Sequence, residues 1–175
     1  EKVTVSIDRQ KLQAVTGADG KWAVDVRPLK AGGPYTLTVS TEKRKLVYEN
    51  VLAGEVWLCS GQSNMEFYLN WSATAAQDVP QAANSNIRLY DMKARWRTDA
   101  VEWDASVLDS LNHLQYYKDT RWTVCSPETA GNFSAVAYYF GKKLQDSLQV
   151  PVGLICNAIG GSPIEAWIDR STLEY

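Results

Sequence analysis

The sequence predicts an α/β domain built on a parallel β-sheet and preceded by a small β-sandwich. Two continuous apolar runs, residues 56–59 and 152–158, are typical of strands buried on both faces, and a helical pattern lies between them. Residues 1–52 instead alternate apolar and polar residues with period two, as half-buried antiparallel strands do. We therefore expect a β-sandwich over residues 1–52 and an α/β domain over residues 53–175.

Composition limits the partners and the compartment that we expect. The 175 residues are 45% hydrophobic, enough for a sizeable core, and carry a formal net charge of −2. This charge gives no reason to expect nucleic acid or a membrane as a partner, and no apolar run is long enough to span a bilayer. The chain opens directly on a strand pattern, so we expect that a signal peptide or other upstream segment precedes it and that the protein is secreted, periplasmic or lysosomal.

The chain has three cysteines, Cys59, Cys125 and Cys156. An odd number forms no even disulfide framework, and two of the three lie inside apolar runs. We expect buried thiols.

The predicted β-sandwich has about five strands joined by turns. The alternation is clearest in three triplets of apolar residues: Val3, Val5 and Ile7; Trp22, Val24 and Val26; and Tyr35, Leu37 and Val39. Asp19 and Gly20 favour a hairpin turn, and residues 32–34, Gly-Gly-Pro, end another connection. The module offers no nucleophile, metal-ligand cluster or glycine cradle, so we interpret it as structural.

The middle of the chain is the least regular part. Residues 74–83 are rich in alanine and predict a helix interrupted by Pro80, and residues 87–92 predict a strand that includes Asp91. Residues 93–128 mix tryptophan, tyrosine and charged residues without clear periodicity. A segment of this length without periodicity predicts a loop-rich excursion near the functional site.

Regular patterns return after Gly131. Apolar residues recur at spacings of three and four over residues 133–148, which predicts a helix capped by Asn132 or Ser134 and followed by Pro151. The apolar run over residues 152–158 predicts the next strand, and a turn and a helix through residues 164–167 follow it. A helix between two such strands is typical of a βαβ unit.

Polar side chains follow the first apolar run where its strand ends. Gln62, Ser63 and Asn64 come after Ser60 and Gly61, at the edge where open α/β sheets bind ligands. Ser63 is the candidate nucleophile, because a serine at a helix N-terminus also has a free N–H group that can stabilise an oxyanion. The alternative is that Ser63 is an ordinary helix N-cap.

Two glycines, Gly160 and Gly161, follow the second apolar run. Glycines at the end of a strand let main-chain N–H groups approach a ligand closely, as an oxyanion hole requires. The same pattern is also found in ordinary tight turns between a strand and a helix.

Residues 54–65, Gly-Glu-Val-Trp-Leu-Cys-Ser-Gly-Gln-Ser-Asn-Met, and residues 157–167, Asn-Ala-Ile-Gly-Gly-Ser-Pro-Ile-Glu-Ala-Trp, resemble the first two blocks of the sialate O-acetylesterase family, a carbohydrate-esterase branch of the SGNH hydrolases. The helix over residues 131–144 is also similar to that family. The resemblance implies a three-layer α/β/α fold, Ser63 as nucleophile and a glycine of the second block as oxyanion donor, which we place at Gly161, with Gly160 as the second choice. Gln62, Asn64 and Gly160 would then contact the substrate.

The family's third block and its late Asp-x-x-His segment have no counterpart in these residues. The single histidine, His113, follows Asp109 by four positions and lies between the first two blocks, so we favour a surface or packing role for it. We expect the catalytic His and Asp beyond residue 175, in the remainder of the same protein or in a separate chain. Residues 53–175 are then the N-terminal part of the esterase domain.

The sequence thus predicts a serine esterase that removes O-acetyl groups from an acetylated sugar or glycan. Serine, base and oxyanion hole suffice for this chemistry, so we expect neither a metal nor an organic cofactor. One alternative is a catalytically incomplete carbohydrate-binding or scaffold protein on an esterase fold. Another acyl hydrolase, such as a thioesterase or lipase, ranks third because the middle of the chain offers no continuous apolar groove.

Overall fold

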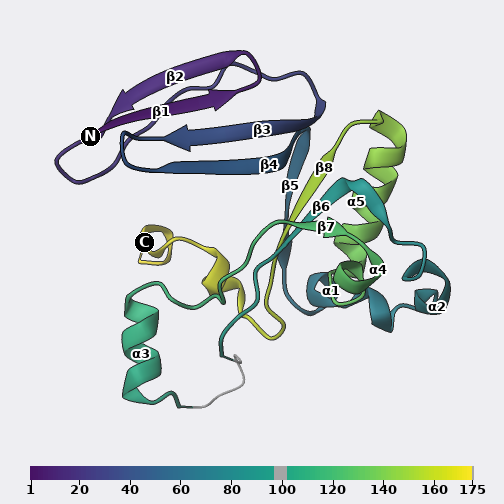
Figure 1. The fold of residues 1–175 in the computed structure, drawn as a ribbon. Helices are drawn as coiled ribbons and strands as arrows, with labels where there is room; N and C mark the ends of the chain where they lie inside the picture. Colours follow the sequence, from purple (N-terminus) through teal and green to yellow (C-terminus); the bar gives the residue numbers. More distant parts are fainter. Residues whose placement is uncertain (97–101, 175) are drawn as a thin grey trace. The chain divides into compact units, whose positions relative to one another are not determined.

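The computed structural model describes residues 1–96 and 102–174 (Figure 1). These residues form two compact units, residues 1–55 and residues 56–175, and each unit is organised on its own β-sheet.

The first unit is built on one four-stranded sheet with the strand order β2-β1-β3-β4. Its strands are β1 (Lys2–Ile7), β2 (Gln10–Val15), β3 (Gly32–Ser40) and β4 (Lys45–Ala53). All three pairings are antiparallel, and Val3, Val5 and Ile7 of β1 are buried as their alternation predicted. The unit thus contains a single sheet where we expected a sandwich of about five strands.

The predicted strand at Trp22, Val24 and Val26 is wrong, because residues 21–30 have no regular secondary structure. The side chain of Gln10 holds this segment instead. Its Nε2 donates to the carbonyl oxygen of Arg27 at 3.1 Å, and the Arg27 N–H donates to Gln10 Oε1 at 2.8 Å. One side-chain amide therefore satisfies both main-chain groups of Arg27, without a neighbouring strand.

The second unit contains a mixed sheet with the strand order β5-β8-β6-β7. Its strands are β5 (Glu55–Gly61), β6 (Asn84–Asp91), β7 (Thr123–Cys125) and β8 (Val152–Ala158). β6 and β8 confirm two predicted strands and pair in parallel, whereas β7 pairs antiparallel with β6. We expected a parallel sheet. The observed sheet is mixed, because a short antiparallel strand, β7, forms one edge.

The prediction that residues 56–59 are buried on both faces is wrong. β5 lies at the other edge of the sheet, and Val56, Trp57 and Leu58 have exposed fractions of 61%, 42% and 63%. Only Cys59 of this run is buried. A continuous apolar run is buried on both faces only where layers cover both, and the exposed Val56 and Leu58 show that the described residues leave one face of β5 uncovered.

The second unit also contains all the helices of the described chain. The α-helices are α1 (Ser63–Glu66), α2 (Ala75–Asp78), α3 (Ala105–Asn112), α4 (Pro127–Ala130), α5 (Ala135–Leu148) and α6 (Arg170–Leu173), and the 3₁₀-helices are η1 (Leu69–Trp71) and η2 (Ile164–Trp167). None of the helices in residues 1–96 and 102–174 is long and apolar enough to cross a membrane.

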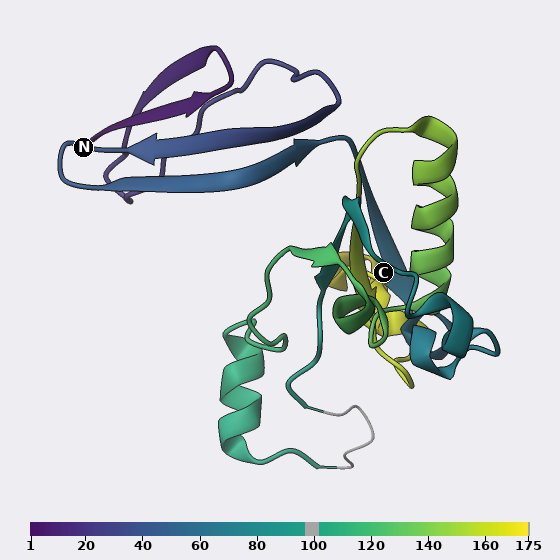
Figure 2. The ribbon, with the colours of Figure 1, turned by 45° about the vertical axis from the view of Figure 1, so that its right-hand side comes forward.

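α5 confirms the long helix that the periodicity predicted. It lies along one face of the β5-β8-β6-β7 sheet in both ribbon views (Figures 1 and 2). Ser134 is its N-cap, because Ser134 Oγ accepts from the Ala137 N–H at 3.1 Å. Gln149 ends it in the left-handed conformation, with φ at 55°. Ala135, Ala137 and Tyr138 form part of its buried face.

The three thiols are free and buried, which confirms their prediction. They belong to the core that β6, β8 and α5 share. Burial raises the pKa of Cys59, raises that of Cys125 to about 11 and raises that of Cys156 to about 12.

Candidate active site

Ser63 lies where β5 gives way to helix α1. Gln62 is the N-cap of α1, and it makes no capping hydrogen bond through its side chain. Ser63 is the first helical residue, its side chain is exposed, and its Oγ has no hydrogen-bond partner among residues 1–96 and 102–174. The interpretation of Ser63 as an N-cap is therefore wrong, since the hydroxyl is available for another purpose.

β8 brings the glycine turn to Ser63. β5 and β8 are neighbours in the sheet, and the Ile159 N–H donates to the carbonyl oxygen of Gly61 at 3.0 Å. The carboxyl ends of the two strands therefore meet. A Cβ atom on Gly160 would lie 3.7 Å from Ser63 Oγ. Two motifs that are about a hundred residues apart in the sequence thus form one site.

The turn leaves one main-chain donor unused. The Gly160 N–H donates to Glu66 Oε2 at 2.6 Å, and the Ser162 N–H donates to the Ile159 carbonyl oxygen at 3.2 Å. The Gly161 N–H has no acceptor in the described part of the chain. Gly161 is exposed and has φ at +81°, a conformation that favours glycine.

The Ser63 N–H also lacks an acceptor within the described residues, as expected for the first turn of a helix. The site therefore offers a hydroxyl and two main-chain donors, from Ser63 and Gly161, at adjacent strand ends. Such an arrangement can bind the oxygen of an attacked carbonyl group.

Ser63, Gln62 and Asn64 border a shallow hollow, and all three are exposed. This hollow has a volume of about 490 Å³. The two substrate-binding candidates of the first motif therefore lie beside the hydroxyl. Gly160, the third candidate, lines a larger cavity, as Gly161 and Glu66 also do.

The larger cavity has a volume of about 650 Å³. Its polar lining residues come from α1 and the segment after it, from the end of β6 and the loop beyond it, from the segment before β7 and from the N-cap of α5: Glu66, Tyr68, Asp91, Lys93, Arg95, Trp96, Lys118 and Ser134. The irregular segment that we expected near the site thus supplies one wall. Residues 97–101 of that segment lie outside the described residues.

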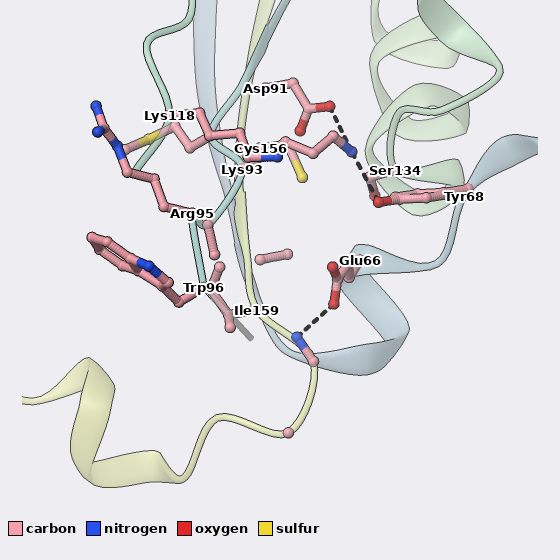
Figure 3. Close-up of a pocket in the computed structure, with 15 residues that line it drawn as sticks. Glu66, Tyr68, Asp91, Lys93, Arg95, Trp96, Lys118, Ser134, Cys156 and Ile159 are labelled. Carbon is pink, nitrogen blue, oxygen red and sulfur yellow. Dashed lines mark hydrogen bonds and ion pairs between the residues drawn. The ribbon is translucent and has the colours of Figure 1, made fainter. Parts of the chain in front are cut away.

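Lys93 is held in this cavity by three acceptors. Its Nζ lies 2.9 Å from Asp91 Oδ2 and donates to Tyr68 Oη at 3.1 Å (Figure 3). It also donates to the carbonyl oxygen of Asn132 at 3.0 Å. Burial disfavours its charge, but the hydrogen bonds with Asp91 and Tyr68 outweigh burial and raise the pKa of Lys93. An ammonium group has three donors, so this network uses all of them.

Asp91 is the half-buried partner of this ion pair. Burial raises the pKa of its carboxyl group, and Lys93 partly opposes that change. Since Asp91 ends β6, the pair fastens the carboxyl end of β6 to Tyr68 and Asn132.

A short pairing between two loop segments builds the wall that the irregular segment supplies. Ala94 and Tyr117 form an isolated antiparallel bridge, and Tyr117 Oη donates to Asn157 Oδ1 at 2.7 Å. The bridge places Arg95 and Lys118 beside the cavity. Arg95 Nε donates to the Tyr117 carbonyl oxygen at 2.8 Å.

Sequence reasoning missed Glu66 and the Asp91–Lys93 pair as parts of the site. Glu66 lies three residues after Ser63, and its side chain contacts the second motif. Asp91 could have been found, because it lies at the carboxyl end of a predicted strand, where the other two motifs also begin. The same rule of strand ends applies to all three.

His113 lies away from these residues. It follows α3, its side chain is 64% exposed, and its Nδ1 lies 2.8 Å from the Asp109 carbonyl oxygen. α3 is well separated from α1 in both ribbon views (Figures 1 and 2). Within residues 1–96 and 102–174, no three His, Cys, Asp or Glu side chains form a group that could hold a metal ion.

Comparisons with known proteins agree with these motifs. The family model described as "Carbohydrate esterase, sialic acid-specific acetylesterase" matches residues 53–175. The chain is 35% identical to the rat sialate O-acetylesterase and 31% identical to the human one. Each match covers 94% of this chain and 30% or 31% of the relative, so the chain spans less than a third of their length.

A solved structure is also similar. The crystal structure of a carbohydrate acetylesterase from Xanthomonas citri matches with a TM-score of 0.84 and 34% sequence identity, over 98% of this chain and 37% of that chain. The chain belongs to the sialate O-acetylesterase family of carbohydrate esterases.

Proposed function

We propose that this chain supplies the nucleophile and the oxyanion hole of a serine esterase that removes O-acetyl groups from an acetylated carbohydrate. The observation that carries the proposal is the meeting of Ser63 and the glycine turn, where the Cβ position of Gly160 is 3.7 Å from Ser63 Oγ. Two free N–H groups, of Ser63 and Gly161, accompany the hydroxyl within the described residues. The enzyme is then a carboxylic ester hydrolase.

The reaction follows from these groups. A base removes the proton from Ser63 Oγ, which attacks the acetyl carbonyl carbon to give a tetrahedral intermediate. The Ser63 and Gly161 N–H groups bind its oxyanion. Collapse expels the sugar alkoxide, which takes up the proton, and leaves an acetyl group on Ser63. Water then hydrolyses this ester and releases acetate. Neither a metal nor an organic cofactor takes part.

The base and its Asp partner come, in this proposal, from residues beyond 175 or from a separate chain of the same protein. The exposed position of His113 supports this view, because His113 is the single histidine of the sequence. The remaining part of the domain would complete a three-layer α/β/α fold of the SGNH type. We place the enzyme in a secreted, periplasmic or lysosomal setting.

The cavity beside the turn supports a sugar as substrate. Its lining includes two acidic and three basic side chains, Glu66, Asp91, Lys93, Arg95 and Lys118, which suit hydroxyl groups better than a fatty chain. A thioesterase or lipase function is therefore disfavoured. A catalytically incomplete binding protein is the remaining alternative, and an activity assay separates it from the esterase.

The test is Ser63→Ala in the full-length protein, assayed with an aryl acetate and with acetylated sugars. We expect the parent to be active and the variant to lose at least about 10³-fold in kcat with an unchanged circular dichroism spectrum. Ser147→Ala, at an exposed position of α5, is the matched control and keeps the activity of the parent. An inactive parent favours the binding protein, and an active Ser63→Ala variant shows that another group is the nucleophile.

A further inference from the structure

Glu66 joins the two motifs of the candidate site through its side chain. It lies in α1, one turn after Ser63, and its Oε2 accepts the hydrogen bond from the Gly160 N–H at 2.6 Å (Figure 3). The donor and acceptor residues are 94 positions apart in the sequence. A main-chain donor and a carboxylate form one of the stronger hydrogen bonds found in proteins.

This bond decides which N–H group of the turn is left for a ligand. The Ile159 N–H donates to the Gly61 carbonyl oxygen, and the Gly160 N–H donates to Glu66 Oε2. The Ser162 N–H donates to the Ile159 carbonyl oxygen. On the far side, Trp167 Nε1 donates to the buried Ser162 Oγ at 2.9 Å. The turn is thus fixed on both sides of Gly161, and the Gly161 N–H is the one left without an acceptor among the described residues.

The space around Gly160 shows how tightly the carboxylate is placed. A Cβ atom at residue 160 would lie only 2.6 Å from Glu66 Oε2, although Gly160 does not have a positive φ. A side chain at residue 160 would therefore displace the Glu66 carboxylate from its hydrogen bond, whereas at residue 161 the backbone conformation itself favours glycine.

We propose that Glu66 is a positioning residue, which holds the Gly160 N–H so that the Gly161 N–H faces the oxyanion formed at Ser63. The proposal rests on the esterase function proposed above and adds a residue to it. A carboxylate close to a developing oxyanion disfavours that charge by electrostatic repulsion. The role therefore depends on the hydrogen bond that Glu66 accepts and not on its negative charge.

Three substitutions of Glu66 in the full-length protein separate these two properties. Glu66→Gln keeps an acceptor oxygen and removes the charge, whereas Glu66→Asp keeps the charge and shortens the side chain by one methylene. Glu66→Ala removes both. We expect Glu66→Gln to keep kcat within about three-fold of the parent, and Glu66→Ala and Glu66→Asp to lower kcat by about 10- to 100-fold. KM for an aryl acetate stays within about three-fold in all three.

Hydrogen exchange supplies a readout that does not depend on turnover. The Gly160 amide, followed by mass spectrometry in peptides that cover residues 157–163, exchanges faster in Glu66→Ala and Glu66→Asp but not in Glu66→Gln. Glu49→Ala removes an exposed carboxylate of β4 and is the matched control, with kcat and exchange as in the parent.

The outcomes are distinct. A Glu66→Gln variant as slow as Glu66→Ala overturns the proposal, because the charge or a proton transfer would then matter. A Glu66→Ala variant with the kcat of the parent, or a slow one with unchanged exchange at residues 157–163, also overturns it. An active Ser63→Ala variant would instead remove the esterase mechanism itself.

Discussion

At the scale of single residues, two adjacent glycines serve the candidate site for different reasons. Gly161 has φ at +81°, where a side chain is strained, and its N–H is free of acceptors in the described chain. Gly160 has no such φ, but a Cβ there would collide with the Glu66 carboxylate. Gly161 thus allows a backbone conformation that a side chain would strain, and Gly160 leaves room for the Glu66 carboxylate.

Gly161→Ala is expected to lower kcat for an aryl acetate by about 10²-fold, because the strained backbone moves an oxyanion donor. The matched control is Gly20→Ala in the first unit, where φ is +77° and no atom lies within 4 Å of the added Cβ. Both variants lose about 1 kcal/mol of unfolding free energy from the same backbone strain. Equal kcat values for the two variants would show that the Gly161 N–H is not a donor.

The buried thiols allow a second test. Burial raises the pKa of Cys125 to about 11 and that of Cys156 to about 12, so both stay protonated at pH 8. The thiolate is the form that reacts, so these cysteines become reactive only as the pH rises towards their pKa values. We expect Cys59, Cys125 and Cys156 to react with iodoacetamide at least about 10²-fold more slowly in the native protein than in urea at pH 8. Peptide mapping by mass spectrometry measures this, and rapid native labelling would contradict the buried placement.

At the scale of elements, α5 and β8 pack closely enough to require a glycine. A Cβ on Gly141 would lie 2.5 Å from Leu154 Cδ1, and Leu154 is 0% exposed. β8 in turn carries the glycine turn at its carboxyl end, so this contact supports the position of the site.

Gly141→Ala is therefore expected to destabilise the protein by about 1 kcal/mol or more, because overpacking by about 1–3 kcal/mol exceeds the helix propensity gained. Ser147→Ala, exposed on the same helix, measures the propensity effect alone and leaves stability unchanged or slightly higher. Chemical denaturation gives both values. A Gly141→Ala variant as stable as Ser147→Ala would show that the helix can move away from β8.

At the scale of the whole molecule, the residues of the candidate site all belong to the second unit. α1, β6, β8 and the loops next to them supply most of these residues. No described residue of the first unit lines the larger cavity. The first unit has its own buried residues on β1.

The position of α3 leads to a prediction at this scale. His113→Ala in the full-length protein is expected to keep kcat and its pH profile, because the imidazole is exposed and hydrogen-bonded to its own helix. Ser63→Ala, assayed in parallel, supplies the inactive reference. Loss of activity in the His113 variant with an intact fold would make His113 the base and end the proposal that residues beyond 175 supply it.

Local patterns determined much of this protein. The periods of three to four and of two residues predicted α5, β1 and β3, and the continuous run at residues 152–158 predicted β8, because neighbouring residues alone set these patterns. Polar and glycine residues directly after two such runs also indicated that Ser63 and the glycine turn lie together, because neighbouring parallel strands end at the same edge of a sheet.

Only the tertiary structure decided how far these patterns were satisfied. The run at residues 56–59 resembles a central strand, yet β5 is an edge strand, because burial depends on neighbours that the run itself does not encode. The alternation at residues 22–26 found no partner strand, because the Gln10 side chain took the hydrogen bonds of Arg27. Glu66 likewise reaches Gly160 across 94 positions, a contact that depends on two strand ends being adjacent and not on any local spacing.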